Sequence, residues 1–297
     1  MTSLEKLFIF KQWFIAFRKK QPFSAPLAMN GFQIIRPPAG RFFADPFVIE
    51  NEGKNYIFFE DYRLRTRKGV ISCIEIDKQG NCSEPRNILE KDYHLAYPFL
   101  LKTEQGIFMI PDTSANNTIE LYEAVKFPYQ WVLKRVMMSG FRASDSTIYP
   151  HNGKWWLFTN VMNPREPAGK GELYVFYADS LFSEWQPHRR NPVNQDPRTA
   201  RPAGNIFFHD GKIIRPSQNC SLQYGASIMV NAITRLTETE YLEQHLFEIG
   251  PEWYQNNRRL HTYNSNDHWE VIDGLIDIVD IFKPVRWLSS LFHRRYK

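Results

Sequence analysis

The stretch RFFADPFVIENEGKNYIFFEDY, residues 41–62, places an acidic residue and a proline directly before an apolar strand, a turn and a second strand. The Glu-Gly-Lys turn at 52–54 is typical of a β-hairpin, because glycine adopts the positive φ that tight hairpin turns require. Asp45 can simply start a turn ahead of Pro46. It can also lie beside Glu60 at the far end of the second strand. The first interpretation gives Asp45 a structural role, and the second gives it a chemical one.

The same unit recurs three more times. It begins with a polar residue, continues through a short apolar strand and a Gly-containing turn, and ends in a second strand rich in aromatic residues. The recurrences read AYPFLLKTEQGIFMIPDT, SDSTIYPHNGKWWLFTN and RPAGNIFFHDGKIIRPSQ. Further strands follow each hairpin, and four strands at a spacing of roughly 50 residues are typical of β-propeller blades around a central channel.

A fifth, shorter unit, RLHTYNSNDHWEVIDG, lacks its outer strand. The segment KQWFIAFR at residues 11–18 can supply that strand and close the ring, which removes exposed sheet edges. A basic amphipathic helix is the alternative for residues 4–20. We therefore predict an all-β, five-bladed β-propeller over residues 1–274. Residues 275–297 are predicted to form a short basic amphipathic helical tail that packs on the propeller or lies on an anionic membrane surface.

The composition limits the class of protein. Of the 297 residues, 43% are hydrophobic and 15% aromatic, which is ample for a packed core and suits strands or a carbohydrate-binding surface. The net charge of +5 indicates an anionic partner only weakly. The three cysteines lack metal-ligand spacing, so neither a disulfide framework nor a metal site is expected.

Other function classes leave no signature in the sequence. There is no phosphate-binding loop, dinucleotide fingerprint or hydrolase motif, so no cofactor is expected. The basic runs lack nucleic-acid-binding motifs, so no nucleic acid is expected either. The first 20 residues do not resemble a secretory signal, and no apolar run approaches the roughly 20 residues that cross a bilayer. We expect a cytoplasmic protein, or one peripheral to the inner face of the membrane.

Equivalent strand ends of different blades converge at one end of the channel, so the repeat predicts a cluster of polar side chains there. The first strands contribute Asp45, Tyr97, Asp145 and Arg201, and the second strands contribute Glu60, Asp112 and Gln218. Paired carboxylates around a cleft are what cleavage of a glycosidic bond needs. We therefore predict catalytic roles for Asp45 as base or nucleophile, for Glu60 as acid and for Asp145. The structural alternative is that both aspartates are turn residues.

The remaining candidates are predicted to bind substrate. They are Asp112, Tyr97, Arg201, Gln218, Tyr224 and His261. Arg201 either binds a carboxylate or phosphate of the ligand or forms an internal salt bridge with Asp145 or Glu60. Tyr224 offers a ring that can stack on a sugar and His261 a titratable donor, and either can equally be an interior residue.

These motifs resemble two related groups of proteins. The ADPF opening, the unit SDSTIY…GKWWLF and the segment LFSEW…NPV resemble the five-bladed propeller glycosidases of the arabinanase, xylosidase and invertase type. The longer series ADPF…YIFFE, YPF…MIPDTS…IELYEA, DSTIY…WWLF, RPAGNIFFHDGKIIRPSQNCSLQYG and HTYN is more similar to the N-terminal propeller region of plant glucosamine inositolphosphorylceramide transferases and related stand-alone bacterial proteins. This likeness spans about residues 13–274.

The resemblance to the glycosidases implies specific roles. Asp45 matches the general base or nucleophile, and Asp145 matches the aspartate that tunes a pKa or stabilises the transition state. The general acid of those enzymes is a Glu opening the fourth blade, where this chain has Arg201 instead. Either Glu60 or Asp112 then serves as the acid, or the chemistry differs, or the protein only binds sugar.

The sequence thus leads to two functional hypotheses. The first is a carbohydrate-active propeller that cleaves or transfers a glycosyl unit on a glycan or glycoconjugate, in bacterial surface-polysaccharide metabolism. The second is a non-catalytic module that binds a sugar or lipid-linked sugar and assists a partner glycosyltransferase. The density of carboxylates at repeat positions favours the enzyme, and the missing Glu favours the module.

Overall fold

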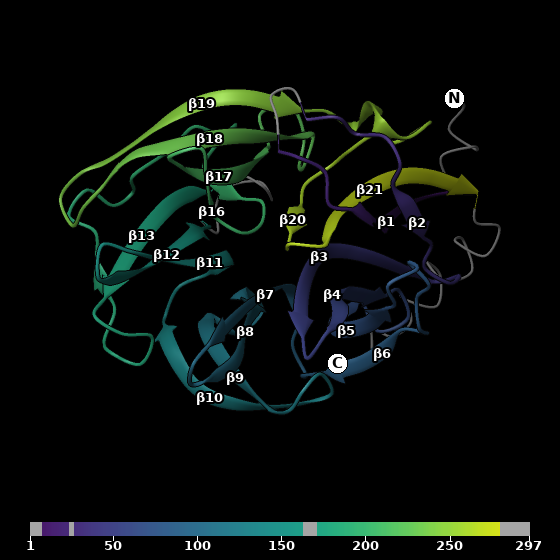
Figure 1. Ribbon diagram of the computed structural model, residues 1–297, viewed down its shortest axis with the longest axis horizontal. Coiled ribbons are helices and arrows are strands. Elements are labelled where there is room, and N and C mark those ends of the chain that lie inside the picture. The colour runs from purple at the N-terminus through teal and green to yellow at the C-terminus, as the bar shows by residue number, and fades with distance from the viewer. Residues whose placement is uncertain (1–7, 24–26, 163–170, 280–297) are drawn as a thin grey trace, which may run out of the picture.

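The computed structural model describes residues 8–23, 27–162 and 171–279. Five antiparallel sheets surround a central axis, so the predicted all-β, five-bladed propeller is confirmed (Figure 1). Two short 3₁₀ helices, η1 (Ser114–Asn116) and η2 (Pro251–Trp253), are the helical elements with bounds in these ranges. In this described part of the chain, no helix has the length and apolar character that a membrane span needs.

The first four blades follow one another along the chain. Blade 1 contains β3 (Arg41–Asn51), β4 (Lys54–Arg63), β5 (Lys68–Ile76) and β6 (Arg86–Leu89). Blade 2 contains β7 (Ala96–Thr103), β8 (Gly106–Thr113), β9 (Thr118–Lys126) and β10 (Gln130–Ser139). Blade 3 contains β11 (Ala143–His151), β12 (Lys154–Val161), β13 (Glu172–Ala178) and β14 (Gln186–Pro187). Blade 4 contains β15 (Arg201–Pro202), β16 (Phe207–His209), β17 (Lys212–Asn219), β18 (Ser227–Leu236) and β19 (Tyr241–Ile249).

Blade 5 joins the two ends of the chain. Its strands are β20 (Tyr263–Ser265), β21 (Trp269–Val279), β1 (Ile9–Lys19) and β2 (Gln33–Ile35), in that order. β1 contains the segment 11–18 that was predicted to close the ring, and it pairs with β21 along its whole length (Figure 1). The N-terminal segment supplies two strands of this blade, whereas one was expected. This closure leaves β21 without a free edge.

The predicted helical tail needs a correction at its start. Residues 275–279 continue β21, because they pair in register with residues 9–13 of β1. The boundary expected at residue 274 therefore falls inside a strand. The rest of the predicted tail, residues 280–297, lies outside the described residues.

The hairpin turns have the geometry that their sequences predict. In blade 1, the two central residues Glu52 and Gly53 have φ of 52° and 76°. Positive φ at both positions is the type I′ conformation, whose twist matches that of the flanking strands. The same pair of conformations occurs at Asn152-Gly153 and at Asp210-Gly211.

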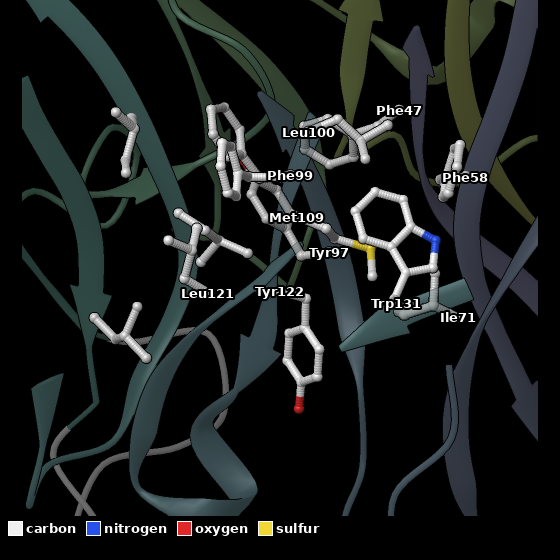
Figure 2. Packing of buried hydrophobic residues seen from close by; sticks show 14 of the residues in the cluster. Phe47, Phe58, Ile71, Tyr97, Phe99, Leu100, Met109, Leu121, Tyr122 and Trp131 are labelled. Atoms are coloured by element: carbon white, nitrogen blue, oxygen red, sulfur yellow. The ribbon is translucent and has the colours of Figure 1, made fainter. Parts of the chain in front are cut away.

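Aromatic side chains pack neighbouring blades against each other. Trp131 of blade 2 meets Phe58 of blade 1 edge to face, with ring centroids 5.7 Å apart. Both belong to a buried cluster shared by blades 1, 2 and 3, part of which Figure 2 shows. The Nε1–H of Trp131 donates to the carbonyl of Pro128 at 2.7 Å, so its polar edge is satisfied. This packing fixes the inner strands relative to one another and thereby the side chains at the channel.

Candidate functional site

A bulge of the same kind interrupts the first strand of blades 1, 2 and 3. In blade 1, Ala44 pairs with Glu60 and the next pair is Phe47 with Phe58, so one extra residue is accommodated on β3. Blades 2 and 3 repeat this register shift. A bulge residue with positive φ follows each first pair: Asp45 at 52°, Tyr97 at 42° and Asp145 at 56°. Such strained non-glycine residues concentrate at functional sites, and here each of the three side chains contacts another blade.

Asp45 is buried and is held by groups from blades 2 and 5. Its Oδ1 accepts a hydrogen bond from Thr262 Oγ1 at 2.9 Å, and its Oδ2 accepts one from the Tyr97 backbone N–H at 3.3 Å. His261 Nε2 lies 3.6 Å from Oδ1. Burial raises the pKa of Asp45, and His261 and Thr262 oppose that rise. These donors favour the ionised form, but burial outweighs them and the pKa of Asp45 stays raised.

Asp273 anchors this part of the site. Its Oδ2 lies 2.5 Å from His261 Nδ1, and its Oδ1 accepts the backbone N–H groups of His261 at 2.9 Å and Thr262 at 3.1 Å. Trp13 of β1 stacks on the His261 ring, with centroids 4.0 Å apart and planes at 17°. Burial lowers the pKa of His261, but the carboxylates of Asp273 and Asp45 outweigh it and leave the pKa raised. The closing strand thus contributes directly to the site.

Asp45, His261 and Asp273 also form the one described group that could hold a cation. Their ligand atoms lie within 4.8 Å of one another. The two imidazole nitrogens face different carboxylates, however, so a cation could use one nitrogen and would interrupt the contact made by that side of the ring. The geometry is that of an ion-paired carboxylate–imidazole–carboxylate chain.

Asp145 is paired with a cation from blade 4. Its Oδ2 lies 2.5 Å from Arg201 Nε and accepts a hydrogen bond from Gln218 Nε2 at 2.9 Å. The guanidinium lies over the Tyr224 ring, 5.0 Å from its centroid. Burial raises the pKa of Asp145 to about 7, although Arg201 opposes the rise. Of the two roles predicted for Arg201, the structure shows the internal ion pair with Asp145.

The alignment that placed Arg201 with Asp45 needs a correction. Arg201 pairs with Gln218. Gln218 is the blade 4 equivalent of Glu60, and Glu60 pairs with Ala44. Arg201 is therefore equivalent to Ala44, which lies one residue before the bulge residue Asp45. β15 has two residues and a longer connection follows it, so the repeat spacing shifts in this blade.

Glu60 has a different environment from both aspartates. It is 5% exposed, and its Oε1 has no hydrogen-bond partner among the described residues. The nearest charged or titratable nitrogen is His94 Nε2, at 3.5 Å. Burial raises its pKa well above the usual range, and the carboxylates of Asp45, Asp112 and Asp145 add to this rise. Burial and the neighbouring carboxylates thus both favour the protonated form of Glu60.

Two predicted ligand contacts are engaged within the protein. Asp112 Oδ1 accepts the Ser114 backbone N–H at 2.8 Å. The fully buried Tyr97 reaches from blade 2 to blades 3 and 4: its hydroxyl oxygen accepts the Gly204 backbone N–H at 2.7 Å and lies 2.9 Å from Thr147 Oγ1. Their roles as substrate contacts remain predictions, and these bonds do not support them.

A cavity of about 280 Å³ lies farther along the inner strands. Phe99, Ile148, Asn205 and Tyr263 are among the residues that line it. Phe99 and Ile148 come after the bulge residues on β7 and β11, so the cavity lies towards the opposite end of the inner strands from the carboxyl cluster.

Sequence reasoning missed several residues of this site. They are Trp13, His94, Asn160, Thr262 and Asp273. Asn160 pairs with Ser144 as Glu60 pairs with Ala44, so the repeat could have found it. Thr262 directly follows the predicted His261. Asp273 lies in the second strand of the fifth unit, so the repeat could have found it as well. Trp13 and His94 lie outside the opening hairpins, where the repeat gives no signal.

The chain is similar to known proteins over most of its length. A model of the family "Glucosamine inositolphosphorylceramide transferase 1, N-terminal" matches residues 22–271. Glucosamine inositolphosphorylceramide transferase 1 of Arabidopsis thaliana is 34% identical over 205 residues, which are 68% of this chain and 27% of that protein. Levansucrase of Gluconacetobacter diazotrophicus is 25% identical over 190 residues, which are 59% of this chain and 29% of that protein. The chain thus spans less than a third of the length of these relatives.

A solved structure supports the fold alone. The α-L-arabinofuranosidase PaAbf62A of Podospora anserina, in complex with cellotriose, superimposes with a TM-score of 0.59 at 10% identity and covers 83% of this chain and 95% of its own. Together, the family match and the sheet topology show that the chain belongs to the glucosamine inositolphosphorylceramide transferase 1 N-terminal family and is a five-bladed β-propeller.

Proposed function

We propose that this protein is a carbohydrate-active enzyme that cleaves or transfers a glycosyl unit, with Glu60 as general acid and Asp45 as base or nucleophile. The observation that carries the proposal is the contrast between these two carboxyls. Asp45 receives hydrogen bonds from Thr262 and Tyr97 and faces His261, whereas Glu60 Oε1 is buried without a donor. The pKa of both carboxyls is raised, but Glu60 lacks the donors that oppose the rise at Asp45. Environments that separate the pKa values of two carboxyls are the pattern of acid–base pairs in enzymes.

The chemistry assigns one task to each group. The Glu60 carboxyl gives its proton to the glycosidic oxygen as the bond between that oxygen and the anomeric carbon breaks. The Asp45 carboxylate attacks the anomeric carbon or takes a proton from an attacking water or hydroxyl group. Asp145, neutralised in part by Arg201, limits the negative charge around the site. A relative is named glucosamine inositolphosphorylceramide transferase 1, which supports a glycoconjugate as the substrate class. Surface-polysaccharide metabolism is the setting that we propose.

The test is turnover of aryl glycosides and of nucleotide- or lipid-linked sugars by the purified chain. Glu60→Gln should lower kcat at least about a hundredfold on substrates with poor leaving groups. It should have little effect on dinitrophenyl glycosides, which leave without protonation. Asp45→Asn should impair turnover of both. Glu52→Gln, an exposed change on the same hairpin, is the matched control and should be neutral.

A sugar-binding module is the second candidate. It is favoured by one observation, the Arg201–Asp145 ion pair in the part of blade 4 where the resemblance to glycosidases would place the acid. Saturable sugar binding that survives Asp45→Asn, with no turnover of any substrate, would support the module and exclude the enzyme. Its role would then be to present the sugar to a partner glycosyltransferase.

A further inference from the structure

His94 lies beside Glu60 in the connection between β6 and β7. Its Nε2 is 3.5 Å from Glu60 Oε1. Its side chain is 36% exposed, so it reaches from solvent to a carboxyl that is almost fully buried. The rings of Tyr62 and His94 meet at a centroid distance of 5.8 Å, which holds the imidazole from one side.

A backbone hydrogen bond fixes the tautomer of His94. The Gly69 N–H donates to Nδ1 at 2.9 Å, so Nδ1 is the acceptor nitrogen. Burial lowers the pKa of His94, although Asp112 and Asp45 oppose that effect. The ring is therefore neutral at neutral pH and its proton is on Nε2, which faces Glu60.

Gly69 provides the space for this contact. A Cβ at this position would lie 2.8 Å from Glu60 Oε1, 2.8 Å from His94 Cε1 and 2.3 Å from the Leu95 carbonyl oxygen. A side chain at residue 69 would therefore force at least one of these groups to move. The pairing is thus supported by three features: an Nε2–Oε1 distance of 3.5 Å, a fixed tautomer and a glycine that admits both groups.

We propose that His94 is a positioning residue for the general acid Glu60, and this proposal rests on the function proposed above. In the reacting state the Nε2–H closes the 3.5 Å gap and donates to Oε1, so the transferable proton resides on Oε2. When the Oε2–H bond breaks and its proton passes to the leaving oxygen, the electron pair stays on the carboxylate, which the same N–H then stabilises. The other charged groups around Glu60 are the carboxyls of Asp45, Asp112, Asp145 and Asp61, none of which can supply this donor.

The kinetic test compares His94→Leu with His94→Gln. His94→Leu should lower kcat about tenfold on poor leaving groups, the scale of one hydrogen bond to a charged group, with KM little changed. Loss of this donor destabilises the Glu60 carboxylate and raises the pKa of Glu60. The alkaline limb of the pH profile, where Glu60 loses its proton, should therefore move to higher pH. His94→Gln keeps an N–H donor and should retain most of the activity and the wild-type limb.

A purely structural role would not reproduce this pattern. It would lower the thermal stability of both variants and leave the alkaline limb in place. An unchanged limb and kcat in a folded His94→Leu protein would overturn the proposal, even with Glu60→Gln inactive. The proposed function would stand in that case.

Nitrogen NMR of the ring gives a readout independent of turnover. The wild-type protein should show His94 with a protonated Nε2 and an unprotonated Nδ1. A second inflection in its pH titration, from Glu60, should disappear in Glu60→Gln and persist in Glu52→Gln. The opposite tautomer, or no second inflection, would overturn the contact. An intact contact in a protein that turns over no glycoside would overturn the proposed function and, with it, the catalytic role of His94.

Discussion

Blades 1 and 3 have the same strand register and bulge at the site but carry different side chains there. Each places an aspartate with positive φ at a bulge, Asp45 in blade 1 and Asp145 in blade 3. In each blade, the residue before that aspartate pairs with a polar residue of the second strand. In blade 1 that second residue is Glu60, whose Oε1 has no hydrogen-bond partner in the described structure. In blade 3 it is Asn160, a neutral amide whose side-chain atoms also have no hydrogen-bond partner in the described structure.

The difference lies in the neighbouring blades. Asp45 is held by Thr262 and His261 of the blade 5 region, whereas Asp145 is held by Arg201 and Gln218 of blade 4. A permanent cation therefore partners one aspartate and a titratable imidazole the other. The blade sets the position of each carboxyl, and the adjacent blade sets its charge.

Removing the permanent cation should have the largest effect on stability. Arg201→Met leaves Asp145 buried without its partner, which should cost about 3–5 kcal/mol in the free energy of unfolding. With Arg201 present, the pKa of Asp145 is already about 7. Without it the pKa is higher still, so Asp145 is neutral in the folded state at pH 5 and the loss should be larger at pH 8.

Urea denaturation at pH 5 and pH 8 measures this difference. The double variant Arg201→Met/Asp145→Leu should recover most of the loss, because no buried charge remains. An equal loss at both pH values, or no recovery in the double variant, would show that the ion pair does not set the stability of blade 3.

The corresponding change beside blade 1 should have the opposite pH dependence. His261→Gln should cost about 2–3 kcal/mol at pH 5, because the charged imidazole interacts with both Asp45 and Asp273. The pKa of His261 is raised in the folded state. Its contribution is therefore fully present below its unfolded pKa and is lost as the pH rises through the folded pKa. Denaturation curves from pH 5 to pH 9 that show a cost growing with pH would contradict this assignment.

The sequence predicted the frame better than the partners. The glycine turns and the period of the repeat are local signals, so the hairpins, the five blades and the closing strand could be predicted from them. The partners are contacts between distant positions: Thr262 reaches Asp45 across 217 residues. Arg201 was placed one position out of register because β15 is short. His94 lies in a connection that the repeat does not cover.

One glycine of blade 1 and one of blade 3 offer a finer comparison. Gly69 lies two positions before Ile71, the partner of Glu60. Gly171 lies two positions before Leu173, the partner of Asn160. A Cβ on Gly69 would lie 2.3 Å from a backbone oxygen, whereas one on Gly171 would meet only side-chain atoms of Asn160 among its three nearest neighbours, the closest at 2.2 Å. Gly69→Ala should therefore cost about 2 kcal/mol and Gly171→Ala about 1 kcal/mol or less.

Thermal unfolding of the two variants tests this ranking. Asn160→Ser should rescue Gly171→Ala, since it removes the side-chain atoms that the new methyl group meets. A shorter side chain at residue 60 should not rescue Gly69→Ala, because the backbone clash with Leu95 remains. Rescue in blade 1, or a larger cost in blade 3, would mean that the two glycines do not differ in this way.

The smallest expected effect is a gain in stability. Glu60 has a folded-state pKa well above its unfolded value, because of burial and then of the neighbouring carboxylates. Between these two pKa values the folded state holds a proton that the unfolded state has released, so stability falls as the pH rises. Glu60→Gln removes this cost and should stabilise the protein by a net amount of about 1 kcal/mol at pH 8, because the buried amide keeps a desolvation cost of its own.

Below pH 4 the carboxyl is protonated in both states, and the gain should vanish. Asp45 and Asp145 titrate in wild type and variant alike, so the difference between the two stability curves reports Glu60. Glu52→Gln, which is exposed, should give a flat difference over the same range. A flat curve for Glu60→Gln would mean that Glu60 is as easily ionised as a surface carboxyl, and blade 1 would then differ from blade 3 only in the cation beside its aspartate.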